Sequence, residues 1–558
     1  MRDLKHWFPF LNWSRPSPQM LHSEAFAGLS VGLMVIPQGV AYAALAGMPL
    51  ITGIYASLIP ALVAVLFSAS SRLSVGPTAL TSILVSASLT GMAEPGSAEW
   101  VNLTVWLSLM TGLLQVGLGF ARFGWLLNLV SSPVLMAFTQ GAGVLIMASQ
   151  LPALLGLTHG WSSLWQPEHI DGASLVFGLV TLVVLVLARR WRPTFPTVLV
   201  VVLAAAGVSA GLDLPAQGTA VVGALPQGLP SLYWPTVLDW PSFKHLVLPT
   251  LVITLVSFLE TASSAKVDND RSGKRWDQDQ DLIGQGLGKV ASGLCGAFPT
   301  SSSFSRSALN LYAGAQSAWA TVFSVGVILL ILLCFTSVLQ PVPQSVLAAI
   351  VVAAVMGLIK PRAFAKLYTI NRVEAATAVV TLVITLLSAP QLYWGVLAGM
   401  LMGLSHFLHT RLHPRIIEVG LHADGSLRDR HLWKLPPLAP QLYALRMDAE
   451  LDFAAASSLE RAVVEHLSHH HDVRHVCLFA QPINRIDATG VESLAKLEAL
   501  LAERHITLHI SGMKLPVETV LHRAGCLQPH AGLRMYRTDT EAIHALQRVD
   551  DFTEEWHI

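Results

Sequence analysis

The sequence predicts a polytopic α-helical membrane protein of about fourteen spans, followed by a small α/β domain. Apolar residues make up 53% of the 558 positions and charged residues only 13%. The apolar residues lie in long uninterrupted blocks as far as residue 409, a pattern typical of helices that cross a lipid bilayer. After His413-Pro414 the composition changes abruptly to that of a soluble domain. The formal net charge is zero, so the composition suggests no nucleic-acid partner.

The apolar blocks fall into two sets of seven, because roughly twenty apolar residues cross the hydrocarbon and shorter blocks can be half-helices. The first set is 24–45, 49–68, 74–91, 103–120, 125–149, 171–189 and 194–211. The second set is 246–266, 282–297, 302–314, 317–339, 344–358, 374–388 and 391–409. The sequence therefore predicts a cytoplasmic segment over 1–20 and a membrane domain over 21–412, with repeats of about 21–211 and 245–409.

Basic residues predict the orientation, because short cytoplasmic loops are enriched in Lys and Arg. With the N-terminus inside, the cytoplasmic loops carry Arg72, Arg122, Arg189, Arg190, Arg192, Lys266, Arg271, Lys274, Arg275, Lys360, Arg362, Lys366 and Arg372. The opposite loops are nearly free of them, and the longest, 211–245, contains only Lys244. We therefore expect both termini in the cytoplasm and the protein in the inner (cytoplasmic) membrane of a cell.

An odd number of spans in each half predicts an inverted repeat, which places a binding site at the repeat interface. A proline beside small or hydroxylated residues lies within the third block of the first half, at 76–79 (Gly-Pro-Thr-Ala), and at the start of the third block of the second half, at 299–303 (Pro-Thr-Ser-Ser-Ser). Proline suits the first turn of a helix, and two facing helix N-termini offer N–H groups and positive charge to an anion. Arg306 would add a full charge, so we predict an anion site without a metal. The alternative is two kinked spans whose hydroxyls bond to their own helices.

The first block holds two further candidates. Gln38 lies in a Pro37-Gln38-Gly39 break, where an amide can donate to an oxyanion and glycine allows close backbone approach. Tyr42 follows one helical turn later and can share the same face. The alternatives are that Gln38 bonds a neighbouring helix and that Tyr42 is a packing residue of the core.

Glu260 lies towards the cytoplasmic end of the eighth block, after a long apolar run. A carboxylate at this depth can pair with a cation or carry a proton. Both interpretations stay open: Glu260 as the group that couples transport to an ion, or a permanent pair with Lys289 or Arg306. Lys289, in the glycine-rich ninth block, is expected to snorkel towards the membrane surface.

The chain resembles the SulP anion permeases (solute carrier family 26) at 37–47 (PQGVAYAALAG), 74–77 (SVGP), 258–260 (FLE) and 305–307 (SRS). The resemblance implies a seven-plus-seven inverted repeat in which a core domain moves against a gate domain, a homodimer, and a transporter of small oxyanions rather than an enzyme, with no cofactor. It implies that Glu260 is the ion-coupling group. It places around the anion Gln38, Tyr42, Thr78, Ala79, Ser301, Ser302, Ser303 and Arg306.

The sequence is compatible with several functions. The glutamate favours proton-coupled symport of sulfate, bicarbonate or a C4-dicarboxylate, and the residues do not decide among these anions. The alternatives are a sodium-coupled symporter of bicarbonate or another anion, a passive anion channel, and a membrane-anchored sensor that signals through its C-terminal domain.

Residues 440–558, after a linker over 413–439, alternate strand-like and helix-like segments, which predicts an α/β domain with a covered sheet. Asp487 is a predicted N-cap for a helix that begins at Ala488. The domain resembles STAS domains, whose bacterial regulatory relatives carry a phosphorylated serine after this aspartate. Ala488 lacks that hydroxyl, and Thr489 is a weaker candidate acceptor. The resemblance implies a cytoplasmic protein partner.

Metal ligands are not expected in this chain. The cysteines show neither pairing nor metal-ligand spacing, which favours free thiols: Cys295, Cys334, Cys477 and Cys526. One histidine cluster could bind zinc, but a polar helix end followed by a loop is the preferred interpretation of His466, His469, His470, His471 and His475.

Overall fold

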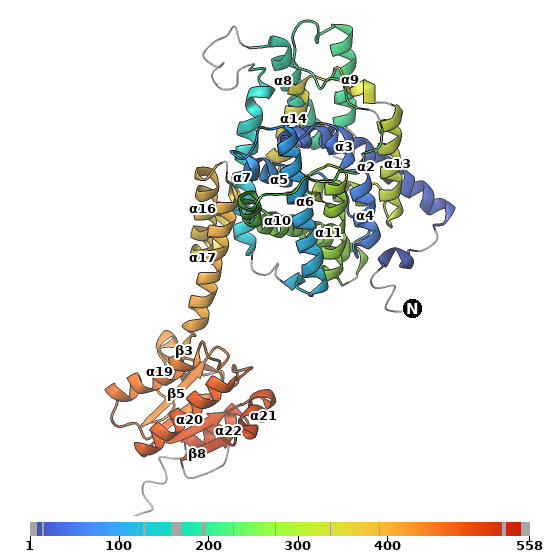
Figure 1. The fold of residues 1–558 in the computed structure, drawn as a ribbon. Helices are drawn as coiled ribbons and strands as arrows, with labels where there is room; N and C mark the ends of the chain where they lie inside the picture. The colour runs from blue at the N-terminus through green and yellow to red at the C-terminus, as the bar shows by residue number, and fades with distance from the viewer. Residues whose placement is uncertain are drawn as a thin grey trace, which may run out of the picture. The chain divides into compact units, whose positions relative to one another are not determined.

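The computed structural model describes residues 8–13, 16–125, 130–157, 170–191, 197–226, 228–273, 275–334, 336–389, 391–526 and 532–547. The chain divides into two compact units, Met1–Gly403 and Leu404–Ile558. The first unit is almost entirely helical, whereas the second contains a six-stranded sheet (Figure 1). The change of composition after residue 413 thus corresponds to a change of architecture.

Each of the fourteen predicted apolar blocks contains a helix, so the predicted helical membrane fold is confirmed. The helices are α2 (Pro18–Leu45), α3 (Thr52–Tyr55) with α4 (Ile59–Phe67), α5 (Ala79–Leu89), α6 (Ala98–Phe120), α7 (Ser132–Leu154), α8 (Gly172–Trp191), α9 (Thr197–Gly211), α10 (Trp240–Ser272), α11 (Gln278–Leu294), α12 (Phe304–Tyr312), α13 (Trp319–Cys334), α14 (Gln344–Met356), α16 (Arg372–Leu387) and α17 (Tyr393–Leu412). Among the described residues, α2, α6, α7 and α10 are long and apolar enough to cross a membrane individually. The shorter ones include the expected half-helices.

The described part of the first unit contains five further elements. The amphipathic helix α15 was not predicted, because it has no apolar block and no buried residue. These elements are two 3-10 helices, η1 (Pro9–Asn12) and η5 (Thr336–Leu339), α15 (Arg362–Ile370), and a pair of two-residue strands, β1 (Val75–Gly76) with β2 (Ser301–Ser302). The strands interrupt the third and tenth blocks at their prolines.

Glycines bring α11 close to the helices on both sides of it. A Cβ added at Gly286 would lie 2.7 Å from the Gly112 carbonyl oxygen of α6, and one at Gly288 would lie 2.9 Å from the Ala64 Cβ of α4. A side chain at either position would force the helices apart. The close helix packing expected for the glycine-rich ninth block is therefore observed.

Substituting Gly53, where α3 crosses α2, is expected to prevent correct folding. An added Cβ would lie 1.9 Å from the Gly39 carbonyl oxygen and 2.3 Å from its carbon, and neither atom belongs to a side chain that can move away. Gly53→Ala should therefore cost about 3 kcal/mol or more. The measurement is monodispersity and melting temperature in detergent. The control is Gly207→Ala in α9, where the new methyl meets nothing within 4 Å and stability should be unchanged or slightly higher. A wild-type melting temperature for Gly53→Ala would contradict this packing.

The second unit is the predicted α/β domain with a covered sheet. Its strands are β3 (Ile416–Leu421), β4 (Leu427–Asp429), β5 (Leu442–Met447), β6 (His475–Phe479), β7 (Thr507–Ser511) and β8 (Leu533–Tyr536), in the order β4-β3-β5-β6-β7-β8. The helices are α18 (Arg430–Trp433), α19 (Ala456–His469), α20 (Ala488–Glu503), α21 (Leu515–Arg523) and α22 (Asp539–Gln547). Strands β5 to β8 run parallel, and β3 and β4 join them antiparallel from within residues 413–439.

Both faces of the sheet are buried. Val476 and Leu478 of β6 pack towards α19, α20 and α21, whereas Cys477 and Phe479 pack towards α22. Alternate residues of a strand point to opposite faces, so a strand covered on both sides reads as a continuous apolar run. The apolar run of β6, His475–Phe479, is such a strand.

The predicted N-cap at Asp487 is present. Its Oδ1 accepts the Gly490 N–H at 2.9 Å and its Oδ2 accepts the Phe453 N–H at 2.9 Å. Burial alone would raise the pKa of Asp487, but these backbone N–H bonds outweigh it and hold the pKa below its usual value.

In the histidine cluster, His466 of the last turn of α19 stacks on Tyr443 of β5 with ring centroids 3.6 Å apart. In the described part of the chain, no group of three or more His, Cys, Asp or Glu residues is arranged to hold a metal ion.

The second unit is expected to lose stability as the pH falls, because of His509 on β7. The ring is fully buried between His475 and Tyr536, each 3.1 Å from one of its nitrogens. Burial, aided by His475 and Arg534, lowers the pKa of His509 to about 3. Between the unfolded value of about 6.5 and this folded value, the unfolded chain binds the proton and the folded domain does not. The free energy of unfolding should therefore fall by about 1.4 kcal/mol per pH unit from pH 6.5 downwards.

Hydrogen exchange of the β7 amides, corrected for intrinsic rates, measures this dependence in the full-length protein between pH 7.5 and 5. His509→Gln removes the titration and retains hydrogen-bonding capacity, so its slope should be flatter. Equal slopes for the wild type and the variant would contradict the assignment to His509.

Candidate anion site

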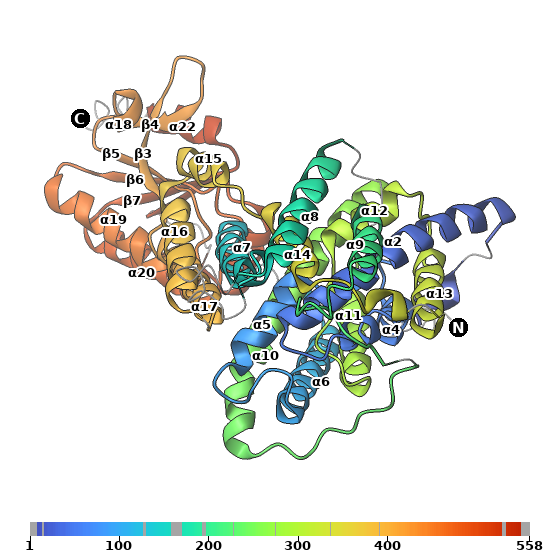
Figure 2. The ribbon, with the colours of Figure 1, turned by 90° about the horizontal axis from the view of Figure 1, so that it is seen from above.

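Strands β1 and β2 pair with each other in the buried interior of the first unit. The pairing is antiparallel, with Val75 opposite Ser302 and Gly76 opposite Ser301. β1 leads into the half-helix α5, and β2 leads into the half-helix α12. The helix α10 packs against α5, α12 and β2, and α2 packs against α5 and α12. The neighbouring positions of α5 and α10 can be followed in Figure 2. The two proline-containing breaks of the sequence therefore lie against each other, as the inverted repeat predicts.

Hydroxyl groups cap both half-helices. Thr78 Oγ1 accepts the Thr81 N–H at 3.3 Å at the start of α5, and Ser303 Oγ accepts the Arg306 N–H at 3.5 Å at the start of α12. In each helix the first amides have no intrahelical acceptor. These amides and the helix dipoles make both ends suitable for an anion.

Glu260 of α10 joins the two breaks. Its Oε2 accepts the Thr78 hydroxyl at 3.1 Å, and the Ser301 hydroxyl, which donates to the Ser257 carbonyl oxygen at 3.1 Å, also lies close to the carboxylate. The residue is partly exposed. Among the described residues, neither Lys289 nor Arg306 has a nitrogen within 4.0 Å of its carboxylate. The structure therefore lacks the ion pair that the alternative interpretation of Glu260 requires.

Arg306 reaches from α12 to the break of the other half. Its Nη1 donates to the Pro77 carbonyl oxygen at 2.9 Å and its Nε donates to Ser74 Oγ at 3.3 Å. The residue is 1% exposed, and its Nη2 has no hydrogen-bond partner among the described residues. Nη2 lies 3.4 Å from where a Cβ on Gly76 would stand, and Ser57 Oγ lies 3.5 Å from the same point. Arg306 thus fixes the start of α5 and places its charge between the two half-helices.

The other predicted residues occupy different positions in this arrangement. Tyr42 is buried and interacts electrostatically with Arg306 and Glu260, so it faces the site. Gln38 is buried one turn earlier, and its Oε1 has no hydrogen-bond partner among the described residues. Ala79 is the first residue of α5. Ala79 thus belongs to a half-helix end, whereas Tyr42 and Gln38 lie on α2, which packs against α5 and α12.

The Ser302 side chain points towards α11. Its Oγ accepts the Gln285 Nε2 of α11 at 3.1 Å, while Ser301 on the same strand faces Glu260. Adjacent residues of an extended strand point to opposite faces, so β2 cannot present both hydroxyls to one ligand. Ser302 therefore holds β2 against α11.

The prediction that Lys289 snorkels is wrong. The residue is 0% exposed, and its Nζ donates to Gln115 Oε1 of α6 at 2.9 Å. The physical reason is the close glycine packing of α11, which leaves the lysine no path to the surface. Gln115 is the signal that sequence reasoning missed, because a single amide within an apolar block indicates a buried polar partner.

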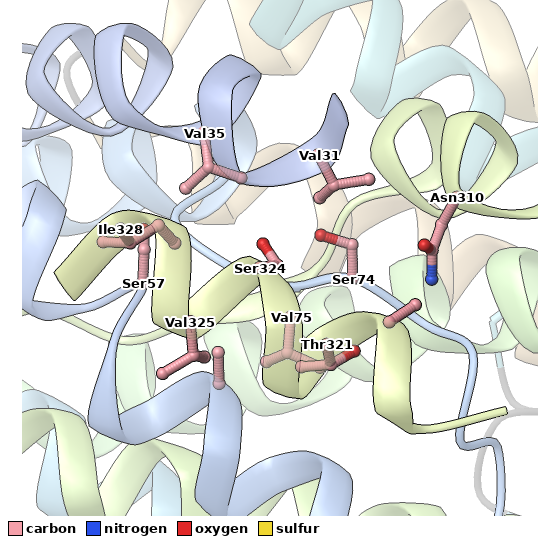
Figure 3. A pocket seen from close by; sticks show the side chains of 12 residues that line it. Val31, Val35, Ser57, Ser74, Val75, Asn310, Thr321, Ser324, Val325 and Ile328 are labelled. Atoms are coloured by element: carbon pink, nitrogen blue, oxygen red, sulfur yellow. The ribbon is translucent and has the colours of Figure 1, made fainter. Parts of the chain in front are cut away.

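A small cavity lies behind β1, among α2, α4, α12 and α13 (Figure 3). It offers about 10 Å³ to the centre of a water molecule, which is space for roughly one water and not for an oxyanion. Its apolar wall comes from α2, α4, β1 and α13, and its polar lining consists of Ser57, Ser74, Asn310, Thr321 and Ser324. The cavity is therefore not the anion site, although Ser74 belongs to both.

Two family models match the chain. The model described as the sulfate permease family matches residues 21–381, and the model described as the STAS domain matches residues 437–542. The first match includes both half-helices and α10. The second includes β5 to β8 and α19 to α21.

Curated relatives are similar over nearly the whole chain. A probable sulfate transporter 4.2 of Arabidopsis thaliana is 32% identical over 93% of this chain and 80% of its own length. A probable sulfate transporter of Mycobacterium tuberculosis is 28% identical over 95% of this chain and 96% of its own length. A sodium-independent sulfate anion transporter of Bos taurus is 29% identical over 93% of this chain and 88% of its own length.

Solved structures share the fold at lower identity. The murine solute carrier 26 family member A9 anion transporter in the inward-facing state matches with a TM-score of 0.87, at 20% identity, over 98% of this chain and 94% of that one. The transmembrane domain of a cyanobacterium bicarbonate transporter matches with a TM-score of 0.58, at 20% identity, over 69% of this chain and 98% of that one.

Proposed function

The chain belongs to the sulfate permease family and is a membrane anion transporter, and we propose that it carries a small oxyanion together with a proton. Sulfate, bicarbonate and C4-dicarboxylates are the candidate anions. The observation that carries the proposal is the contact of one carboxylate, Glu260, with the start of both half-helices through Thr78 and Ser301. The protein acts as a secondary transporter rather than an enzyme.

The anion binds between the N-termini of α5 and α12. The free amides of both first turns donate to its oxygens, with the hydroxyls of Thr78, Ser301 and Ser303 beside them. Gln38 and Tyr42 approach from α2, and Ala79 supplies a backbone amide. Ser302 supports the site through β2, and Arg306 supplies positive charge while its hydrogen bonds fix the two breaks together.

Proton coupling follows from the position of Glu260. An ionised carboxylate beside the half-helix ends repels an oxyanion, and protonation removes that repulsion. The anion therefore favours the protonated carboxyl group, and by linkage the proton favours the loaded site. This reciprocity makes the two ligands move together.

We extend the proposal to the setting of the protein. The distribution of Lys and Arg supports an inner-membrane location with both termini in the cytoplasm. The core, which carries the half-helices, moves as an elevator against a gate in a homodimer. Residues 21–412 form the transport domain, and residues 440–558 form a STAS domain that binds a cytoplasmic protein.

Uptake into proteoliposomes tests this function. The purified protein is offered radiolabelled sulfate, bicarbonate and succinate, with and without an inward proton gradient and with and without sodium. We expect saturable uptake of one anion class, with accumulation above equilibrium only when the outside is acidic. Acceleration by sodium alone indicates sodium coupling, and conductance far above transporter rates indicates a channel. If no anion is carried and deletion of 440–558 abolishes a signal, the protein is a sensor.

A further inference from the structure

Lys289 is fully buried and has no role in the transport cycle proposed above. α11 holds it between α6 and α4, and its Nζ donates to Gln115 Oε1 at 2.9 Å. A buried ammonium group costs several kcal/mol of desolvation unless an opposite charge or hydrogen bonds compensate. One amide oxygen is weak compensation. The lysine therefore needs a negative charge nearby in at least one state of the protein.

Hydrogen bonds connect Lys289 with the surroundings of Glu260 through two different atoms of Ser257, its side-chain oxygen and its carbonyl oxygen. Gln115 Nε2 donates to Ser257 Oγ at 3.0 Å, and the Ser257 carbonyl oxygen accepts the Ser301 hydroxyl at 3.1 Å. The Ser301 hydroxyl also reaches the Glu260 carboxylate. Lys289, Gln115, Ser257 and Ser301 are each 0% exposed, so water does not screen this path.

Ser301 makes the path sensitive to the proton on Glu260. A hydroxyl has one hydrogen to donate, and Ser301 has two acceptors, the Ser257 carbonyl oxygen and the carboxylate. An ionised Glu260 takes that hydrogen, whereas a protonated Glu260 can donate to Ser301 Oγ and turn its hydrogen back to Ser257. The last link before the carboxylate therefore differs between the two protonation states.

Few other charges act on Glu260. Arg306 of α12 and Tyr42 of α2 interact with it electrostatically, as does Lys289. Of the other elements packed against α10, α5 and β2 contain no titratable residue, α6 contains Glu99 in its first turn, and α11 contains Asp279 and Asp281 in its first turn besides Lys289. Arg306 is already occupied by the Pro77 carbonyl oxygen and Ser74. Lys289 donates to a single acceptor, whereas Arg306 donates to two, although the Arg306 Nη2 has no partner among the described residues.

We propose that Lys289 is a positioning residue for proton coupling, whose charge stabilises the ionised form of Glu260 and sets the pH at which the transporter takes up its proton. The inference rests on the proposed proton-coupled function. When the site faces the outside, the Glu260 carboxyl group receives a proton and the half-helix ends receive the anion. The positive charge of Lys289 is present throughout this step. When the proton leaves, Lys289 supplies the compensating charge within the protein.

The pH dependence of radiolabelled sulfate uptake by the full-length protein tests this role. Removing the cation makes the ionised carboxylate less favourable, so Lys289→Met should move the pH of half-maximal uptake upwards by about 1 unit. Gln115→Glu places a carboxylate against Nζ at nearly unchanged volume, and it should move the midpoint in the same direction. Lys366→Met removes an exposed lysine of α15 and should leave the midpoint unchanged.

Gln115→Glu carries the test if Lys289→Met does not fold. Unshifted midpoints in folded variants would overturn the role of Lys289, as would a change in KM without a change in the pH profile. If the wild type carries sulfate without any pH dependence, the proton coupling itself fails. A pH-dependent wild type with unshifted variants removes this inference alone.

Discussion

Arg306→Ala is expected to reduce saturable anion uptake by about 100-fold or more, the effect of losing a buried, hydrogen-bonded charge. The substitution removes the positive charge between the two half-helices. It also removes the donors to the Pro77 carbonyl oxygen and Ser74 Oγ, which then lie buried without those partners. Each lost partner costs about 1–3 kcal/mol, so the variant should melt at a lower temperature but still fold. Initial uptake rates in proteoliposomes and melting curves in detergent measure the two effects.

Two variants separate the charge of Arg306 from its hydrogen bonds. Arg306→Lys keeps the charge, but a single ammonium group cannot reproduce the planar arrangement of Nε and Nη1. Ser74→Ala removes one acceptor and leaves the charge in place. If geometry matters, Arg306→Lys should transport poorly, and Ser74→Ala should lose less activity than either. Wild-type uptake by Arg306→Ala would show that the anion binds elsewhere.

Glu260→Gln is expected to abolish accumulation driven by a proton gradient. Glutamine keeps the size of the side chain and can still accept the Thr78 hydroxyl, but it cannot bind or release a proton. Because the side chain is permanently neutral, the repulsion of the anion is absent at every pH. Downhill anion exchange should therefore persist and lose its pH dependence, while accumulation above equilibrium falls by at least about 10-fold.

A control is available in Glu24, a buried carboxylate of α2. Its Oε1 accepts the backbone N–H groups of Gln316 and Ser317 at 2.8 Å, away from the half-helix ends. Glu24→Gln should lower stability and leave the response to the proton gradient intact. Glu260→Gln with undiminished gradient-driven accumulation would exclude Glu260 as the coupling group.

The half-helices could be predicted because proline and small residues leave a clear mark on a sequence. Pro77 and Pro299 interrupt apolar blocks at matching places in the two halves, and the same positions carry the paired strands. Arg306 was predicted at the site, but its acceptors were not, because one of them is a backbone carbonyl oxygen. Any residue provides such an oxygen, so no sequence pattern announces it.

The sequence does not predict which distant segments contact each other. Thr78 and Glu260 are brought together only by the packing of α10 on α5, and Lys289 was placed at the surface because its helix neighbours were unknown. In the second unit, β3 and β4 lie where a linker was expected, since their membership of the sheet depends on pairing with β5. Apolar periodicity indicates which residues are buried and does not indicate against what.

The pairing of β1 with β2 has a consequence for how the two halves of the chain can diverge. The strands hold each other through main-chain groups, and the Ser303 N–H extends the contact to the Ser74 carbonyl oxygen at 3.0 Å. Main-chain bonding does not require matching side chains, so Val75 can face Ser302 without loss of the pairing. The two repeats can therefore differ in sequence while the backbone keeps their pseudo-twofold relation. The second repeat supplies Arg306, and the first supplies its hydrogen-bond acceptors, Ser74 and Pro77.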